Sequence, residues 1–390
     1  MSDPVVKGWC PGAHRPMVSG DGLLVRVRPW LGTLSDFELR GLAELATQFG
    51  NGTVDATSRA NLQIRGVAEG RLPSVLEGLD ALGLLDPDDG SEARRNIILD
   101  PFRAEDDPQI RISQALADAL RGAEYVDLPN KFGFVLDTGC RPRVLAKVSG
   151  DIRVESNARG LLVRADGAPA GRPVEDPEDA VGVALALARW FLASGGVGAD
   201  GRGRMAQHLA SGAKLPADLI GTEMPAPEAP RPEPGPRAGG LAVGAAFGQF
   251  TAAQLTRIAD ALAPGGALRV TPFGLLFLTE PPAHDVLSGS DLITAPGDPL
   301  LRIAACVGAP GCEQGEIATR QIARRLATRL PGRIRAHVSG CAKGCAWPGK
   351  ADLTLVGRAG RFDLVREGTA RDVPERRGLS HADLEQLFGP

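Results

Sequence analysis

The chain has 390 residues, of which 43% are hydrophobic and 23% charged, and its net charge is −3 at pH 7. These proportions are typical of a soluble globular protein, and the length exceeds one ordinary core, so two or three domains are expected. A slightly acidic chain without a long apolar run predicts neither nucleic-acid binding nor a membrane span. The first residues lack the apolar core of a signal peptide, and with six cysteines this predicts reduced thiols and a cytoplasmic location.

A loop rich in Gly and Pro opens the chain and leads into a predicted strand. Cys10 and His14 lie in this loop, and a lone pair with that spacing is more often structural or incidental than metal-binding. Apolar and polar residues then alternate over 22–28, which predicts a half-buried strand. Its polar face carries Arg26 and Arg28, so two guanidinium groups point the same way.

A helix and a second strand follow. Ser35 and Glu38 have the spacing of a capping box, and the apolar residues after them recur with a helical period. The segment 51–66 is again strand-like, with Leu62 and Ile64 on one face. The other face is polar and carries Arg59, Asn61, Gln63 and Arg65.

This strand–helix–strand unit returns about 216 residues later, in segments 239–262 and 265–280. Thr251 and Gln254 restate the capping box. The polar face does not return, because Phe273 takes the place of Arg59 and the residues after it are apolar. We therefore expect the first copy to bind a charged ligand and the second to serve packing.

Between the copies lie mixed strands and helices, including a strongly apolar helix, and then a Pro-rich stretch that predicts a linker with little capacity to pack. The predicted fold is α+β, with two pseudo-duplicated halves, each a repeat unit followed by an α/β module. A ligand commonly lies in the crevice between such halves. The expected segments are the first repeat unit, the first module, the linker, the second repeat unit and a cysteine-bearing module, at 1–75, 76–223, 224–240, 241–297 and 298–390.

Four cysteines dominate the last segment. Cys306 and Cys312 have five residues between them, and Cys341 and Cys345 have three. Two such pairs can hold a [4Fe–4S] cluster, and the glycines beside them leave room and free N–H groups for the sulfurs. Structural zinc is the main alternative, although the wider pair fits it poorly, and disulfides are more typical of small secreted domains.

The cysteine pattern, with Ser-Gly before the second pair, resembles the cluster signature of the sirohaem nitrite and sulfite reductase superfamily. That resemblance implies ferredoxin-like repeat units and a nitrite/sulfite reductase-like fold. In the reductases the last cysteine also bridges to the sirohaem iron, and the resemblance implies that Cys345 is the corresponding residue here.

Three further segments resemble the parts of this superfamily that surround the tetrapyrrole. Arg59 lies in TSRANLQ, which is similar to T-x-R-Q-x-x-Q with one glutamine replaced by Ala60. Arg95 lies in EARRNIILDP, similar to an Arg-Asn-Val segment. Lys131 lies in LPNKFGF, where Gly133 replaces the second of two lysines that surround the anion in the reductases. The loss of that cation argues against anion reduction.

The chain length, the opening segment and LPNKFGF resemble the precorrin-3B synthases, the monooxygenases of aerobic cobalamin biosynthesis. The resemblance implies that precorrin-3A occupies the sirohaem position and that dioxygen supplies a C-20 hydroxyl, with a ring A acetate closing a γ-lactone. It also implies a [4Fe–4S] cluster, a mononuclear non-haem iron and electrons from a separate NAD(P)H-dependent reductase. The expected tetrapyrrole-binding residues are Arg26, Arg28, Arg59, Asn61, Gln63, Arg95 and Lys131.

Two other functions stay open. A sirohaem-dependent nitrite or sulfite reductase would use the same four cysteines, and an electron carrier or zinc-stabilised tetrapyrrole-binding protein would show no turnover. The five histidines are scattered and form no signature of a 2-His-1-carboxylate site, so the sequence assigns no ligands to the non-haem iron and no catalytic residue.

Overall fold

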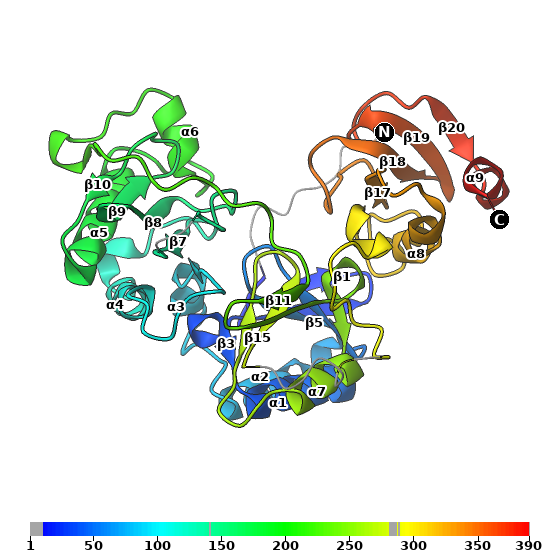
Figure 1. Cartoon of the computed structure of the whole chain (residues 1–390), viewed down its shortest axis with the longest axis horizontal. Helices are drawn as coiled ribbons and strands as arrows, with labels where there is room; N and C mark the ends of the chain where they lie inside the picture. Colours follow the sequence, from blue (N-terminus) through cyan, green and yellow to red (C-terminus); the bar gives the residue numbers. More distant parts are fainter. Residues whose placement is uncertain (1–10, 140–141, 281–286, 288, 390) are drawn as a thin grey trace.

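The computed structural model describes residues 11–139, 142–280, 287 and 289–389. In this part of the chain a central domain carries one α/β module on each side, and the cysteine-bearing module is the one on the right in Figure 1. No helix of the described chain is long and apolar enough to cross a membrane.

The first repeat unit forms a five-stranded sheet of order β1-β2-β5-β4-β13. Val25 and Val27 are fully buried against the helices, as the alternation predicts. The capping box forms, because Ser35 Oγ accepts from the Glu38 N–H and the Glu38 carboxylate accepts from the Ser35 N–H. The elements that this unit supplies are β1 (Met17–Ser19), β2 (Gly22–Val27), β3 (Thr33–Leu34), α1 (Asp36–Phe49), β4 (Thr53–Ala56), β5 (Leu62–Val67) and α2 (Leu72–Ala81).

The second unit repeats this architecture in a sheet of order β11-β12-β15-β14-β3. The second capping box, at Thr251, is also formed. Even the strained turn before the helix recurs, since Leu31 and Phe247 have φ of 54° and 62°. The elements of this unit are β11 (Gly235–Arg237), β12 (Gly240–Gly244), β13 (Gln249–Thr251), α7 (Ala252–Asp260), β14 (Leu268–Val270) and β15 (Leu275–Thr279).

The two units exchange their short strands. β3 of the first copy pairs with β14, and β13 of the second copy pairs with β4. Helices α1, α2 and α7 gather below the two sheets, and residues of both copies share one hydrophobic core (Figure 1). Neither unit can therefore complete its sheet alone.

The two modules share one topology, in which three parallel strands are followed by two antiparallel ones. The first contains α3 (Asp89–Arg94), β6 (Ile97–Leu99), α4 (Gln109–Ala119), β7 (Phe134–Asp137), β8 (Ile152–Asn157), β9 (Gly160–Ala165), β10 (Arg172–Pro173), α5 (Pro177–Ala193) and α6 (Met205–Ala210). The second contains β16 (Ile303–Ala305), α8 (Thr319–Arg329), β17 (Ala336–Ser339), β18 (Ala351–Arg358), β19 (Arg361–Gly368), β20 (Arg376–Leu379) and α9 (His381–Phe388).

Two details differ from the sequence-based segmentation. The boundary expected at residue 75 falls inside α2, whose Leu79 belongs to the core of the central domain. The Pro-rich stretch 224–240 packs more than expected, since its backbone around Ala226 and Pro227 bonds to Arg143 and residues 235–237 form β11. Proline removes N–H donors but leaves carbonyl acceptors, and Arg143 uses these.

One face of the second repeat unit corresponds to the polar face of the first. This face is apolar and packs against other parts of the protein, as expected. Phe277 lies edge-on against Phe102 of the first module, with ring centroids 5.0 Å apart. Phe273 and Leu275 join this apolar cluster. The face of the second sheet is thus covered by protein.

Candidate functional site

The polar face of β2 and β5 is the centre of the candidate site. Arg26 lies directly across from Gln63 in the antiparallel pair. Arg26 is only 6% exposed, yet its Nε and Nη1 atoms are buried without a hydrogen-bond partner. A buried guanidinium without partners is costly, and an anion bound beside it would offset that cost.

One end of β5 contacts the cysteine-bearing module. A bulge places Arg65 and Gly66 opposite a single residue of β2, and Gly66 has φ of 68°, which favours glycine. Arg65 Nη2 donates to the carbonyl of Gly311 at 3.1 Å, and Ser19 Oγ donates to the same oxygen at 2.6 Å. This carbonyl directly precedes Cys312, so the first repeat unit holds the first cysteine loop.

Charged side chains surround that contact. Arg65 binds Asp21 through two nitrogens at 2.9 and 3.0 Å, and Asp55 through a third at 3.0 Å. Arg320 of α8 lies 3.5 Å from the Asp55 carboxylate. Two arginines and two aspartates thus join the central domain to the cysteine module in a nearly neutral, largely buried network.

The other end of the polar face contacts the first module. Arg59 lies in the turn between β4 and β5, which Asn61 and Thr57 close through two hydrogen bonds of 2.9 and 3.2 Å. Arg59 Nη2 donates to the carbonyl of Lys131 at 3.3 Å. The structure therefore brings Arg59 close to Lys131 and Gly133, although Arg59 lies 72 residues before Lys131 in the sequence.

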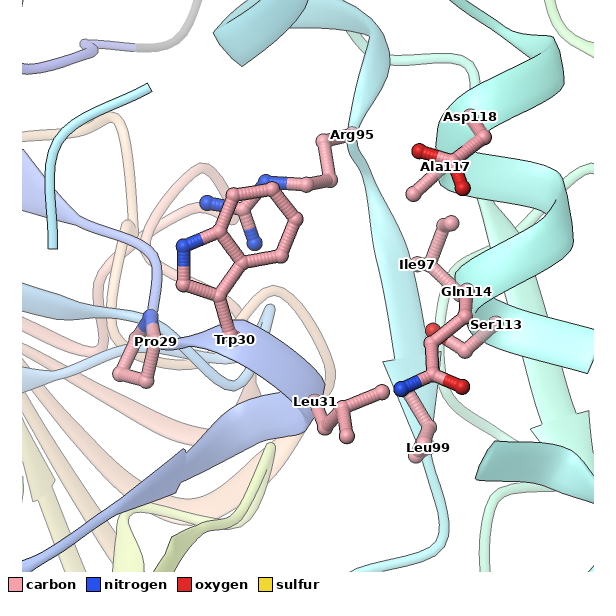
Figure 2. A pocket seen from close by; sticks show the side chains of 10 residues that line it. All are labelled: Pro29, Trp30, Leu31, Arg95, Ile97, Leu99, Ser113, Gln114, Ala117 and Asp118. Atoms are coloured by element: carbon pink, nitrogen blue, oxygen red, sulfur yellow. The ribbon is translucent and has the colours of Figure 1, made fainter. Parts of the chain in front are cut away.

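Arg28 and Arg95, by contrast, are bound within the protein. Arg28 Nη1 donates to the Glu92 carbonyl at 2.6 Å and to Asn96 Oδ1 at 2.9 Å, and burial is the main cause that lowers its pKa to about 10. Arg95 pairs with Asp86 at 2.7 Å, and its guanidinium stacks over the Trp30 ring at 3.9 Å (Figure 2). Both join the central domain to the first module, so the expectation that they contact a ligand gains no support.

The four cysteines follow the ends of parallel strands. Cys306 comes directly after β16 and Cys341 shortly after β17, so both loops leave the same edge of the sheet. Their backbones are tied locally, since Thr319 Oγ1 donates to the Cys306 carbonyl and Ser339 Oγ to the Cys341 carbonyl. Cys345 is exposed to solvent and the other three are partly buried.

Several features of these loops fit an iron–sulfur cluster. The Gly340 N–H donates to Cys306 Sγ at 3.1 Å, as backbone amides do for cluster sulfurs. A Cβ at Gly340 would lie 3.1 Å from the Cα of Gly308, so a side chain would crowd the loops. Burial, with smaller contributions from the other thiols, raises the pKa of the partly buried Cys341, and a bound metal would offset that effect.

A single-ion site is not evident. Within the ranges that the structure describes, no three His, Cys, Asp or Glu side chains converge on a point where one metal ion could bind. In a [4Fe–4S] cluster each thiolate binds a different iron, so the ligands surround a larger group than one zinc ion. Four thiolates in two pairs are a donor set that can hold such a cluster.

The histidines do not assemble an iron site in the described chain. His14 bonds to the Asp86 carbonyl at 2.6 Å, and His208 to Ser194 at 2.8 Å. His337 is fully buried on β17, and His381 begins α9. Cys10, Cys140 and His284 lie outside the described residues, so the expectations for the Cys10–His14 pair are not addressed. These histidines do not fit the ligand set of a non-haem iron.

Sequence reasoning missed three residues that organise the site. Arg65 was on the predicted polar face, but nothing local showed that it reaches Gly311. Asn96 directly follows Arg95 in the Arg-Asn segment, so the motif includes it, but the sequence did not indicate which residues it contacts. Asp151, which bonds to the Gly133 N–H at 2.9 Å, carried no signal in the sequence.

Comparison with known proteins agrees with this architecture. The family model of the nitrite/sulfite reductase ferredoxin-like half domain matches residues 15–82. A precorrin-3B synthase from Sinorhizobium sp is 33% identical over 400 residues, covering 94% of this chain and 84% of that protein. A ferredoxin–nitrite reductase from Synechococcus elongatus is 30% identical over 151 residues, which is 36% of this chain and 29% of that protein.

Among solved structures, the NirA protein of Mycobacterium tuberculosis superposes with a TM-score of 0.62 and covers 91% of this chain and 77% of its own. At 20% identity this likeness concerns the fold alone, and it confirms the predicted reductase-like architecture. The Sinorhizobium protein, in contrast, matches along nearly the whole chain. The chain therefore belongs to the precorrin-3B synthase family of oxidoreductases, within the nitrite/sulfite reductase-like superfamily.

Proposed function

We propose that this chain is a precorrin-3B synthase, which uses dioxygen to convert precorrin-3A into precorrin-3B. One oxygen atom becomes the C-20 hydroxyl and the other leaves as water, which consumes two electrons and two protons. The ring A acetate closes the γ-lactone. The observation that carries this proposal is the buried, unpartnered guanidinium of Arg26 on a strand face that reaches both modules.

The polar face suits a polycarboxylate. Arg26 and Arg59 bring two guanidinium groups to this face, and such groups favour carboxylates as partners. Lys131 is half-buried beside Arg59 and adds a third cation. Gln63, opposite Arg26, offers an amide that can donate to a carboxylate or accept from a pyrrole N–H. A macrocycle with several acetate and propionate groups could offer a carboxylate to each of these cations.

Cys306, Cys312, Cys341 and Cys345 would hold the [4Fe–4S] cluster. The cluster would supply single electrons beside the tetrapyrrole, received from an external reductase that uses NAD(P)H. Arg65 and Ser19 fix the loop of Cys312 through the Gly311 carbonyl, so the first repeat unit sets how that loop faces the ligand. The mononuclear iron and the cytoplasmic location stay predictions.

Anaerobic purification followed by turnover tests the proposal. We expect iron and labile sulfide without sirohaem absorption bands. With precorrin-3A, a reductase and isotopically labelled dioxygen, we expect one labelled oxygen atom in the product. Sirohaem bands together with nitrite or sulfite reduction would refute the proposal in favour of the reductase, and zinc without iron would refute both activities.

A further inference from the structure

The loop that carries Lys131 is held from three sides. Asn96 Nδ2 donates to the carbonyl of Asn130 at 2.9 Å and to that of Phe132 at 3.3 Å. Arg59 Nη2 donates to the carbonyl of Lys131, the residue between Asn130 and Phe132. Every carbonyl of residues 130–132 thus accepts from a side chain that lies far away in the sequence. The Lys131 side chain, in contrast, has no hydrogen bond or ion pair in the described structure.

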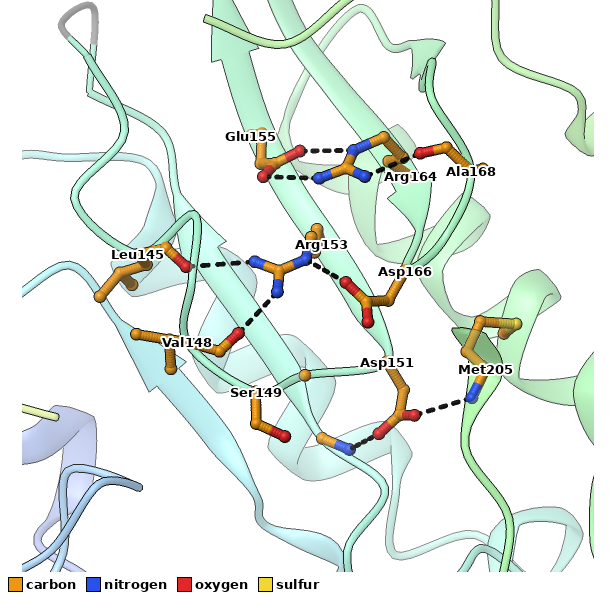
Figure 3. A network of polar contacts seen from close by, with 12 residues as sticks. Leu145, Val148, Ser149, Asp151, Arg153, Glu155, Arg164, Asp166, Ala168 and Met205 are labelled. Atoms are coloured by element: carbon orange, nitrogen blue, oxygen red, sulfur yellow. Dashed lines mark hydrogen bonds and ion pairs between the residues drawn. The ribbon is translucent and has the colours of Figure 1, made fainter. Parts of the chain in front are cut away.

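The far side of the loop is fixed by Asp151. The fully buried Asp151 carboxylate accepts from the Gly133 N–H at 2.9 Å. The backbone N–H of Asp151 donates to the Gly133 carbonyl at 2.7 Å. Arg204 Nε donates to the same carboxylate at 2.9 Å. The Met205 N–H also donates to it at 2.9 Å, as Figure 3 shows. The loop cannot shift in this direction without breaking a buried charge network.

Asn96 is the link between this loop and Arg28. Its Oδ1 accepts from Arg28 Nη1 at 2.9 Å, and because a guanidinium only donates, the orientation of the amide is fixed. Nδ2 must then face the loop carbonyls, and it also donates to the nearby Ala93 carbonyl at 2.9 Å. Asn96 is 6% exposed, so these hydrogen bonds are shielded from water. Arg28 is therefore connected to the loop indirectly, through its hydrogen bond to Asn96.

We propose that Asn96 is a positioning residue that sets Lys131 toward the tetrapyrrole carboxylates, and that Arg28 works through Asn96 and not on the ligand. The inference rests on the proposed function, in which Lys131 meets an anion. A lysine side chain is long and flexible, so its ammonium gains most from a backbone that is already in place.

The same geometry explains Gly133. A Cβ at this position would lie 3.2 Å from the Asn96 carbonyl and 3.7 Å from Arg59 Nη1. The glycine therefore lets the loop lie close to Asn96 and Arg59. A side chain at 133 would press against the Asn96 carbonyl, and a lysine there would add a cation beside Arg59.

A double-mutant cycle tests the inference, with uroporphyrin III as a stable carboxylated tetrapyrrole probe and fluorescence quenching of the purified protein to give Kd. We expect Asn96→Ala and Lys131→Ala each to raise Kd about tenfold, as for the loss of one charge-assisted contact. In the Lys131→Ala background, Asn96→Ala should then add nothing. Asn157→Ala, which removes the amide hydrogen bonds to Glu223, Met224 and Arg159 at a distant strand end, is the matched control and should bind like the wild type.

Additive effects, or an unchanged Kd for Asn96→Ala, would overturn the role of Asn96 while the proposed function stands. An unchanged Kd for both Lys131→Ala and Arg26→Met would contradict the binding site itself and leave Asn96 nothing to position. Should Asn96→Ala fail to fold, Asn96→Asp keeps the volume and the acceptor for Arg28 but not the donors. Hydrogen exchange over residues 129–134 must then quicken, and unchanged exchange would refute the inference.

Discussion

Replacing Arg26 by methionine tests the candidate site through two effects of opposite sign. In the ligand-free protein the buried guanidinium has two nitrogens without partners and lies close enough to Arg28 for the two charges to repel each other. Removing an unpaired buried charge while keeping most of the volume typically stabilises a protein by about 1–3 kcal/mol. We expect Arg26→Met to raise the free energy of unfolding by that amount.

Ligand binding should change in the other direction. A guanidinium–carboxylate pair formed in a shielded site contributes about 1.5–3 kcal/mol, so its loss weakens binding by about ten- to a hundredfold. We therefore expect a more stable protein whose Kd for a carboxylated tetrapyrrole is at least tenfold higher. Urea unfolding and fluorescence quenching measure the two quantities on the same preparation.

Arg153 provides the matched control because it is equally buried but fully bound. It is 4% exposed, and its guanidinium binds Asp166 at 2.6 Å and the carbonyls of Leu145 and Val148 (Figure 3). Arg153→Met should destabilise by about 3–5 kcal/mol, as breaking a buried pair does. If Arg26→Met also destabilised the protein and left Kd unchanged, Arg26 would be a structural arginine and the reasoning would fail.

Two further substitutions address the second module. Cys345→Ser should lose iron and labile sulfide while Cys10→Ser keeps both; full iron content in Cys345→Ser would remove it from the ligand set. Burial lowers the pKa of His337 from 6.5 to about 4, so the folded protein keeps it neutral. Its contribution to stability is full above pH 6.5 and falls by about 3 kcal/mol as the pH falls to 4. Urea unfolding of His337→Leu should lack this loss, and an equal acid sensitivity would contradict the assignment.

Local patterns predicted the parts of the fold that depend on neighbouring residues. Alternation placed Arg26 and Gln63 on a polar face, and both capping boxes formed where their spacing indicated. The exchange of β3 and β13 was not predictable, because two or three residues carry no periodicity and their partners are distant in sequence.

The same limit explains the arginines. Arg26 and Arg28 have identical signals in the alternating strand, yet only Arg28 meets acceptors, and these come from Glu92 and Asn96 in the first module. Arg95 resembles a ligand-binding residue by motif, but Asp86 and Trp30 bind it. Residue type and the alternation along a strand indicate that a cation lies on one face of the sheet. Only the tertiary contacts show whether the protein already uses its charge.

The two repeat units share one architecture, but the candidate site is formed on only one of them. The two repeat units match in strand order and even in a strained turn, but only the first keeps a polar face. That face contacts the Lys131 loop at Arg59 and the cysteine loop at Arg65, and the six residue steps from one to the other span at most about 20 Å. Because β5 is a central strand with neighbours on both sides, this separation cannot change without breaking the sheet. A ligand held by Arg59 and Arg26 is therefore kept at a fixed distance from the cysteine loop.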